Sequence, residues 1–168
     1  MKRNDLEIER KFLIRMPDRA LLDRIGECSE IEQTYLSPDA EGVRARIRRR
    51  SRNGESVYTL TTKSHLTDMT RIEIEREIGR AEYEKLLQQA DPERRTIRKT
   101  RCCIPYEGQL FEIDLFPFWK KQAYLEIELE REDQPVRFPP YIELLREVTS
   151  EERYTNSSLA KEIPEEEL

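Results

Sequence analysis

The sequence has little of what marks a membrane-spanning or secreted protein. No apolar run approaches the roughly 18 residues of a membrane-spanning helix, and the charged N-terminus lacks the apolar core of a signal peptide. Glycine is scarce, with 5 residues, and histidine and tryptophan occur once each. We therefore expect a soluble, cytoplasmic protein with no membrane partner.

Cysteine and histidine are too few to form a familiar metal site. The three cysteines, Cys28, Cys102 and Cys103, cannot all pair and lack the spacing of zinc ligands, so we expect reduced thiols. The only histidine, His65, stands at the end of a predicted strand with no ligand-type residue beside it. This position favours a structural or surface role.

Neither sign of charge dominates the chain. The net charge of -5 gives no reason to expect a nucleic-acid partner. Charged residues make up 39%, which would suit a partly disordered chain if the charges came in blocks, but they alternate with apolar residues. The chain of 168 residues has no internal repeat or long linker, so we expect one domain over residues 1–168.

Alternation with a period of two predicts eight strands, mostly antiparallel neighbours. The predicted strands cover residues 5–15, 31–36, 42–51, 55–65, 70–79, 96–104, 109–116 and 123–131. Asn53-Gly54 is a strong hairpin signal between two of them. Helices are predicted at 17–25, 81–90 and 140–147, and Thr149 to Glu152 matches a capping box before a last short helix that Asn156 could cap.

Seven of these strands place charged side chains on a single face. The first strand puts Glu7, Glu9 and Lys11 on one side and apolar residues on the other. An antiparallel sheet with one wet face gives the same alternation. However, arginine repeated at 44, 46 and 48 brings like charges within about 6 to 7 Å, which is tolerated best when a ligand or counter-charge compensates.

Eight antiparallel strands are enough to close a barrel around side chains or one small ligand. We therefore predict an α+β, mainly β protein: an eight-stranded antiparallel closed β-barrel, or tunnel, with a charged lumen and helices packed outside. A lumen with both signs of charge suits a polyphosphate with a divalent metal. Arginine and lysine bind phosphate oxygens, and carboxylates hold Mg²⁺ or Mn²⁺.

An ordered series of motifs resembles the CYTH superfamily, also called triphosphate tunnel metalloenzymes. Residues 7–11, Glu-Ile-Glu-Arg-Lys, match the ExExK signature of that family. The similarity continues in the family's order through residues 33–36, 43–46, 63, 71–75, 99–101, 111–114, 125–128 and 147–149. It covers about residues 5 to 160.

The resemblance implies a role for each matching residue. The implied metal ligands are Glu7, Glu9, Glu126 and Glu128. The implied phosphate-binding residues are Lys11, Arg44, Arg46, Lys63, Lys99 and Arg101. A second acidic group comprises Glu73, Glu75, Glu112 and Asp114. Lys11 and Tyr35 match a catalytic dyad that activates water, with Glu73 or Glu75 as the rival base. Arg48 and Arg71 are left open, since either could lie at the tunnel mouth.

The function implied by the resemblance is Mg²⁺- or Mn²⁺-dependent hydrolysis of a small-molecule triphosphate. Inorganic triphosphate is favoured because the short chain has no obvious nucleoside pocket, although nucleoside and thiamine triphosphates carry the same group. The alternatives are a class IV adenylate cyclase and a non-catalytic polyphosphate or nucleotide sensor. A homodimer is left open. Trp119 is expected to pack beneath the barrel, and the Arg94-Arg95 and Lys120-Lys121 pairs are expected to be solvated.

Overall fold

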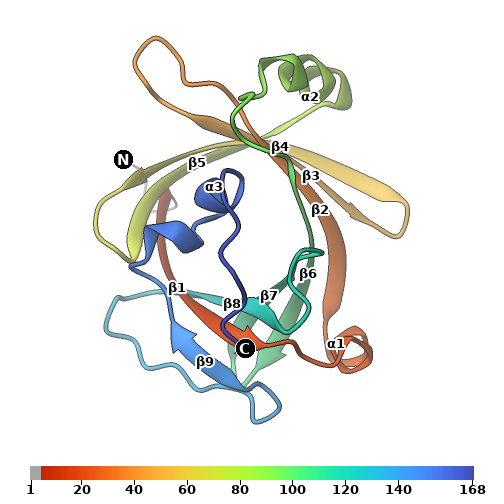
Figure 1. Ribbon diagram of the computed structural model, residues 1–168, viewed down its shortest axis with the longest axis vertical. Helices are drawn as coiled ribbons and strands as arrows, with labels where there is room; N and C mark the ends of the chain where they lie inside the picture. The colour runs from red at the N-terminus through yellow and green to blue at the C-terminus, as the bar shows by residue number, and fades with distance from the viewer. Residues whose placement is uncertain (1–4) are drawn as a thin grey trace.

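The computed structural model describes residues 5–168, so residues 1–4 of the predicted domain and N-terminus lie outside the described part. Strands predominate, and short helices lie between and after them (Figure 1). In chain order the elements are β1 (Leu6–Arg15), α1 (Arg19–Ile25), β2 (Glu27–Tyr35), β3 (Ala45–Arg52), β4 (Glu55–His65), β5 (Thr70–Ile78), α2 (Arg80–Leu86), η2 (Leu87–Gln89), β6 (Ile97–Tyr106), β7 (Gln109–Leu115), β8 (Gln122–Leu129), β9 (Leu144–Glu147), η3 (Glu152–Tyr154) and α3 (Asn156–Leu159).

Eight of these strands form the closed antiparallel barrel that the alternation predicts. Their order is β5-β4-β3-β2-β6-β7-β8-β1, and pairing of β1 with β5 closes the ring. The closing contact is short, because it joins only Leu6, Glu7 and Ile8 to residues 70–72. The hairpin at Asn53-Gly54 is confirmed: both residues have positive φ, 52° and 79°, as a tight hairpin turn requires.

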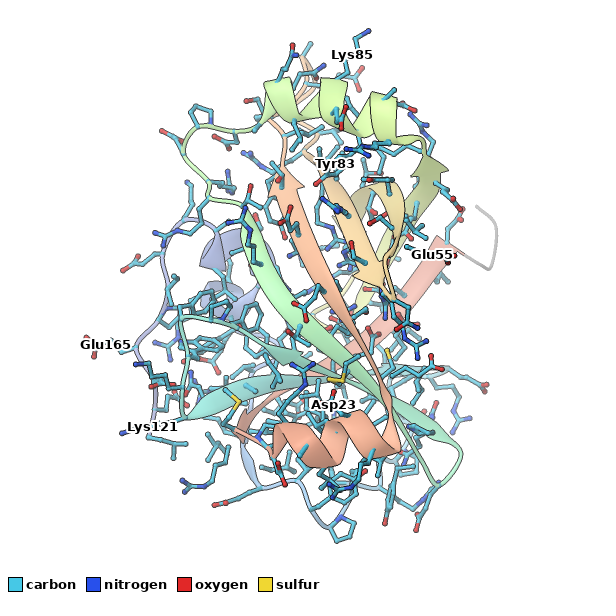
Figure 2. All side chains as sticks on the ribbon, turned by 90° about the vertical axis from the view of Figure 1, so that its right-hand side faces the viewer. Asp23, Glu55, Tyr83, Lys85, Lys121 and Glu165 are labelled. Atoms are coloured by element: carbon cyan, nitrogen blue, oxygen red, sulfur yellow. A yellow bond between two sulfur atoms is a disulfide. The ribbon has the colours of Figure 1, made fainter. Side chains whose placement is uncertain are left out.

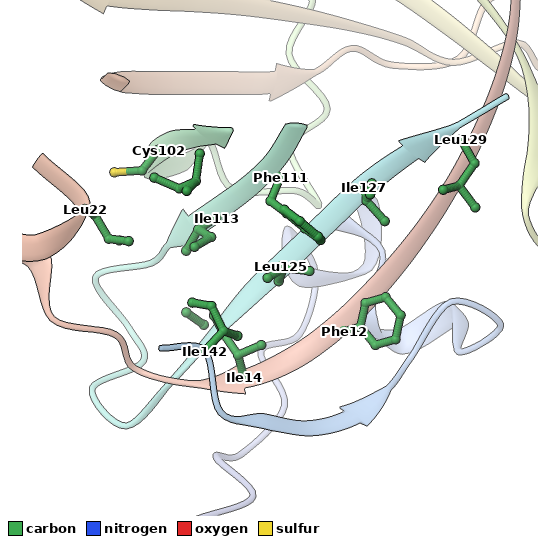
Figure 3. Packing of buried hydrophobic residues seen from close by; sticks show 12 residues of the cluster. Phe12, Ile14, Leu22, Cys102, Phe111, Ile113, Leu125, Ile127, Leu129 and Ile142 are labelled. Atoms are coloured by element: carbon green, nitrogen blue, oxygen red, sulfur yellow. The ribbon is translucent and has the colours of Figure 1, made fainter. Parts of the chain in front are cut away.

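The apolar side chains pack on the outside of the barrel. Figure 3 shows Phe12 and Ile14 of β1 beside Leu125 and Ile127 of β8, and Leu22 of α1 belongs to the same buried cluster. Because side chains alternate along a strand, this packing turns the charged residues of β1 and β8 inward. The predicted orientation of the first strand is therefore confirmed.

Two helices cover this apolar exterior, as predicted. Asp18 caps α1 by accepting a hydrogen bond from the Ala20 amide at 3.0 Å. Tyr83 of α2 is buried against the strands, where its ring lies 4.8 Å from that of Tyr58 (Figure 2). Among residues 5–168, no helix is both long enough and apolar enough to cross a membrane.

The segment 148–163, here called the C-terminal plug, packs against inward-facing side chains at one end of the barrel. Leu159 and Tyr154 of the plug share a buried cluster with Leu13 of β1 and Tyr35 of β2. Trp119 belongs to the same cluster, and its indole N–H donates to the Pro164 carbonyl at 3.0 Å. The prediction of Trp119 as a packing residue is confirmed.

Two expectations for the C-terminal region were wrong. Residues 140–147 are not helical, because 144–147 form β9 and pair with β1, which satisfies the backbone groups by strand pairing instead. Thr149 caps no α-helix: its hydroxyl accepts from the Lys11 amide at 3.0 Å, and Thr155 rather than Asn156 caps α3. In both cases contacts with β1 or within the plug decide the local structure.

The expectation of three reduced cysteines was also wrong. Cys28 and Cys102 form a disulfide, and Cys103 is free. The two bonded cysteines stand 74 residues apart in the chain, but β2 and β6 pair them directly opposite each other. Their Cα atoms are 4.0 Å apart. Spacing along the sequence gives no sign of this register.

Candidate active site

A charged cavity of about 790 Å³ occupies the interior of the barrel. Inward-facing residues of β1 to β8 line it, together with residues 149–152 and 155–158 of the plug. Among the lining residues are Glu7, Glu9, Lys11, Tyr35, Arg44, Arg46, Arg48, Lys63, Arg71, Glu73, Glu75, Arg94, Arg101, Glu112, Glu126 and Glu128. Most residues that the sequence assigns to the site therefore face one space.

Three carboxylates meet on one wall of this cavity. Oxygens of Glu7, Glu9 and Glu128 all lie within 4.8 Å of one another, because β1 and β8 pair Glu9 opposite Glu128. Burial, together with the charges of Glu126 and Glu7, raises the pKa of Glu9 to about 8. Burial and the charge of Glu7 also raise the pKa of Glu128. Lys63 is the one cation in ion-pair contact with these three carboxylates in the described part of the chain, so the group keeps excess negative charge that a hard divalent cation would offset.

Glu126, which was predicted as a fourth metal ligand, lies instead beside two cations. Its carboxylate is 3.3 Å from Lys11 Nζ and 3.9 Å from the Arg101 guanidinium. Burial opposes the charge of Glu126, but attraction to Lys11 and Arg101 outweighs it and lowers the pKa to about 2. Glu126 is thus already neutralised by lysine and arginine, and its role as a metal ligand stays a prediction.

The predicted second acidic group is split between two places. Glu73 of β5 lies 3.6 Å from Lys63, which also contacts Glu7 at 2.8 Å. Glu75 accepts a hydrogen bond from the Thr61 hydroxyl at 3.0 Å. Strands β1 and β8 separate β5 from β7 around the barrel, so Glu112 and Asp114 on β7 belong to a different set of contacts.

Asp114 is the centre of a buried ion cluster. It contacts Lys99 Nζ at 2.7 Å and accepts two hydrogen bonds from Arg101, at 2.7 and 2.9 Å. Glu112 lies 2.5 Å from the same guanidinium. Burial opposes ionisation of Asp114, but Arg101 and Lys99 hold its pKa well below the usual range. Burial lowers the pKa of Lys99 to about 7, since Arg101 already shares the carboxylate.

Four arginines of the cavity have no carboxylate partner among residues 5–168: Arg46, Arg48, Arg50 and Arg71. Arg50 donates to the Ser29 hydroxyl at 2.7 Å, whereas the Nε atoms of the other three are buried without a hydrogen-bond partner. Burial and the charges of Arg46 and Arg101 lower the pKa of Arg48 to about 9. Uncompensated buried guanidinium groups favour an anionic ligand. Arg48 and Arg71, which the sequence left open, share the parity of their inward-facing neighbours, and this signal could have placed them in the cavity.

Lys11 is held by the plug and by β8. Its Nζ donates to the Tyr154 carbonyl at 3.2 Å and lies 4.7 Å from the centre of the Tyr124 ring. The Tyr124 hydroxyl donates to the same carbonyl at 2.6 Å. Within the described chain no hydrogen bond joins Lys11 to Tyr35, although both line the cavity. The predicted dyad stays a prediction, and sequence reasoning missed Tyr124 and Tyr154.

Two further arginines occupy the end of the cavity near the plug. Arg44 precedes β3 and forms an ion pair with Asp91. Arg94 was expected to be solvated, but it lines the cavity and contacts Asp91 at 2.8 Å. His65 is exposed at the end of β4, as expected, and it also borders the cavity. Sequence reasoning missed Asp91, whose distance from β3 in the chain hides its contact with Arg44.

Comparison with known proteins agrees with this architecture. A model of the CYTH domain matches residues 5–154. An inorganic triphosphatase of Nitrosomonas europaea is 34% identical over 162 residues, which cover 94% of this chain and 99% of that protein. An inorganic triphosphatase of Acetivibrio thermocellus is 36% identical over 157 residues, covering 92% and 93%.

The similarity extends to three dimensions. The crystal structure of the inorganic triphosphatase NE1496 matches this fold with a TM-score of 0.60 at 31% identity, covering 95% of this chain and 97% of that one. The closed antiparallel barrel and its charged interior are thus accompanied by sequence similarity along nearly the whole chain. The protein belongs to the CYTH domain family.

Proposed function

We propose that this chain is a divalent-metal-dependent triphosphatase that releases the terminal phosphate of inorganic triphosphate. The observation that carries the proposal is the meeting, in one cavity, of a three-carboxylate group in which Glu9 and Glu128 have no ion-pair partner among the described residues with four arginines that have no carboxylate partner there. In a triphosphate with a bound divalent cation, the cation would bind the carboxylates and the phosphate oxygens would accept hydrogen bonds from the arginines. The two relatives described above are inorganic triphosphatases, which supports this choice of substrate.

Glu7, Glu9 and Glu128 would hold the metal. Carboxylate oxygens are the ligands that Mg²⁺ and Mn²⁺ prefer, and the pKa of Glu9 is raised by burial and by the charges of Glu126 and Glu7, which a bound cation would offset. When bound, the ion would supply charge neutralisation at the phosphate oxygens. Lys63, placed 2.8 Å from Glu7, would orient that carboxylate and reach the substrate from the same wall.

The basic residues would bind and orient the phosphate chain. Arg46, Arg48 and Arg71 have buried donors with no protein partner, and an arginine can grip phosphate with two parallel hydrogen bonds. These donors would stabilise charge that develops on the phosphate oxygens in the transition state. Arg101 would contribute from a position fixed by Asp114. Lys99, bound to the same carboxylate, is fully buried and does not line the cavity, so its role in phosphate binding stays a prediction.

We assign activation of the attacking water to Lys11 and Tyr35, in which Lys11 accepts the proton of the water after it has released its own to solvent, with Glu73 or Glu75 as the alternative acceptor. Tyr35 lines the cavity beside the plug, and Lys11 is fixed by Glu126 and the Tyr154 carbonyl. Nucleoside and thiamine triphosphates present the same phosphate chain and are included as candidate substrates. The cytoplasmic location and the homodimer stay predictions.

A phosphate-release panel tests the proposal. Purified protein is incubated with inorganic triphosphate, ATP or thiamine triphosphate, with Mg²⁺, Mn²⁺ or EDTA. We expect the fastest release from inorganic triphosphate and none with EDTA. Cyclic AMP and pyrophosphate formed from ATP would instead identify a cyclase. Calorimetric binding of triphosphate without release of phosphate would identify a sensor.

A further inference from the structure

Asp91, in the loop between η2 and β6, holds two arginines with one carboxylate. Its Oδ2 accepts hydrogen bonds from Arg44 and, at 2.8 Å, from Arg94. Its Oδ1 accepts from the Glu93 amide at 2.9 Å, which fixes the carboxylate in the loop. Asp91 itself is only 7% exposed, so this arrangement is an interior one.

The Arg94 side chain is directed into the cavity rather than into solvent. It is 13% exposed, lines the main cavity, and has a buried Nε with no hydrogen-bond partner in residues 5–168. Arg44 lines the same cavity and uses one nitrogen for both Asp91 and the Leu36 carbonyl. Both guanidinium groups therefore keep donors that Asp91 does not use. A turn that merely linked Asp91 to Arg94 would not need a buried, unpaired donor in the cavity.

The neighbouring Arg95 provides a contrast within the same loop. Its side chain is exposed and does not line the cavity, and only its backbone amide is engaged, with the Ala160 carbonyl at 2.8 Å. Of these two adjacent arginines, only Arg94 contacts Asp91 and lines the cavity.

The charges at this place do not cancel. Two guanidinium groups share one carboxylate, which leaves one net positive charge. The hydrogen bond from the Glu93 amide, followed by those from Arg94 and Arg44, lowers the pKa of Asp91 to about 2. Asp91 is therefore ionised throughout the neutral pH range, and the excess positive charge is permanent.

This basic pair lies where the cavity meets the plug. Tyr35 packs in the plug cluster, and its carbonyl accepts from the Asp91 amide at 2.9 Å. The loop that carries Asp91 and Arg94 therefore borders the plug.

We propose that Arg94 is a further substrate-binding residue, which together with Arg44 holds an end phosphate of the substrate beside the plug, and that Asp91 is the positioning residue for both. The inference rests on the proposed function, since it assumes a triphosphate in the cavity. A free end phosphate carries more negative charge than one esterified to a nucleoside. The pair therefore favours inorganic triphosphate over organic triphosphates.

The test compares Arg94→Ala with Arg95→Ala, which removes the same charge one residue away. We expect Arg94→Ala to raise KM for inorganic triphosphate about tenfold or more, as loss of a charged hydrogen bond would. We expect Arg95→Ala to leave KM within about twofold. Asp91→Asn keeps an acceptor for the Glu93 amide but removes the charge on Oδ2. It should raise KM for the same substrate and change kcat by less than about threefold.

The activity of wild type and the KM values of the variants distinguish failure of the proposed function from failure of the Arg94 assignment. If wild-type protein neither binds nor hydrolyses triphosphate, the proposed function itself is wrong. If wild type is active and the Arg94 and Arg95 variants have equal KM values, the assignment of Arg94 is overturned. A fall in kcat at unchanged KM in Asp91→Asn would likewise overturn its positioning role. Should Arg94→Ala fail to fold, Arg94→Lys keeps the charge, and calorimetry with inorganic triphosphate should still show weaker binding than wild type.

Discussion

Glu126 and Glu128 stand two residues apart on β8 and face the same cavity, yet their carboxyl pKa values move in opposite directions. Strand pairing places Lys11 opposite Glu126 and Glu9 opposite Glu128. For Glu126 the attraction to Lys11 outweighs burial and lowers the pKa, whereas for Glu128 burial and nearby acids raise it. At the scale of single residues, the residue opposite on the neighbouring strand decides whether a carboxylate is neutralised by a lysine or stays available to bind a metal ion.

Replacing Glu9 by glutamine should separate metal binding from folding. The change removes one oxygen ligand, so we expect metal-dependent phosphate release to fall by roughly 100-fold or more. The pKa of Glu9 is raised from 4.5 to about 8, so the folded protein keeps a proton that the unfolded chain releases. Metal-free wild type should therefore lose stability as the pH rises from about 4.5 to 8.

Glutamine at this position does not titrate, so the variant should lack that loss. Urea unfolding without metal, at pH 5 and at pH 8, measures the free energy of unfolding of both proteins. The free energy of unfolding of Glu9→Gln relative to that of wild type should be larger at pH 8 than at pH 5. A variant that is equally destabilised at both pH values would instead show that Glu9 has a structural role.

Tyr35→Phe tests the proposed dyad with little disturbance of packing. The ring stays in the aromatic cluster, and no hydrogen bond from the Tyr35 hydroxyl occurs among the described residues to be lost. If the hydroxyl takes part in proton transfer, kcat should fall by about 100-fold or more at nearly unchanged KM. Steady-state kinetics with inorganic triphosphate measures this. Unchanged kcat would favour Glu73 or Glu75 as the proton acceptor.

Strand pairing also decides structure at the scale of whole elements. Residues 140–147 have the composition of a short helix, but 144–147 extend the sheet beside β1, because β1 offers backbone partners there. The same principle joins Cys28 of β2 to Cys102 of β6. Local propensity is a weak preference that tertiary contacts override in both places.

Loss of the disulfide should destabilise the barrel without altering its site. It closes a loop of 74 residues, and removing such a bond costs about 2–4 kcal/mol of unfolding free energy. Cys102 lies in the outer apolar cluster, so the double change Cys28→Ala with Cys102→Ala should leave KM for triphosphate unchanged. Thermal unfolding with and without reductant checks this. The matched control is Cys103→Ala, which keeps the disulfide. Reductant should lower its Tm by as much as it lowers that of wild type.

At the scale of the whole molecule, the barrel brings together two charged walls that come from distant parts of the chain. The acidic group is drawn from β1 and β8, while the unpaired arginines come from β3 and β5. Enclosing these charges costs free energy that a folded protein recovers on binding the matching ligand. Ligand binding and stability should therefore be strongly linked.

Metal and triphosphate together should stabilise the protein more than the sum of either alone. A ligand present at about 100 times its Kd adds about 2.7 kcal/mol, which corresponds to roughly 5 to 10 °C in Tm for a chain of this size. Differential scanning calorimetry with Mg²⁺, with triphosphate, and with both measures the effect. The measurements are made on ice-cold mixtures heated at once, so that turnover is limited. Additive shifts would contradict a shared site.

The sequence by itself determined the eight barrel strands and which of their side chains face the interior, but not β9. Alternation along each strand sorts residues such as Glu7 and Ile8 onto opposite faces, and this sorting depends only on local backbone geometry. Only the tertiary structure decided which inward residues neutralise one another. Glu126 contacts Lys11, Asp114 contacts Lys99, and Asp91 contacts Arg44, because strand register and loop placement join residues that lie far apart in the chain. Electrostatic partnership depends on distances of a few ångströms, and local sequence does not specify them.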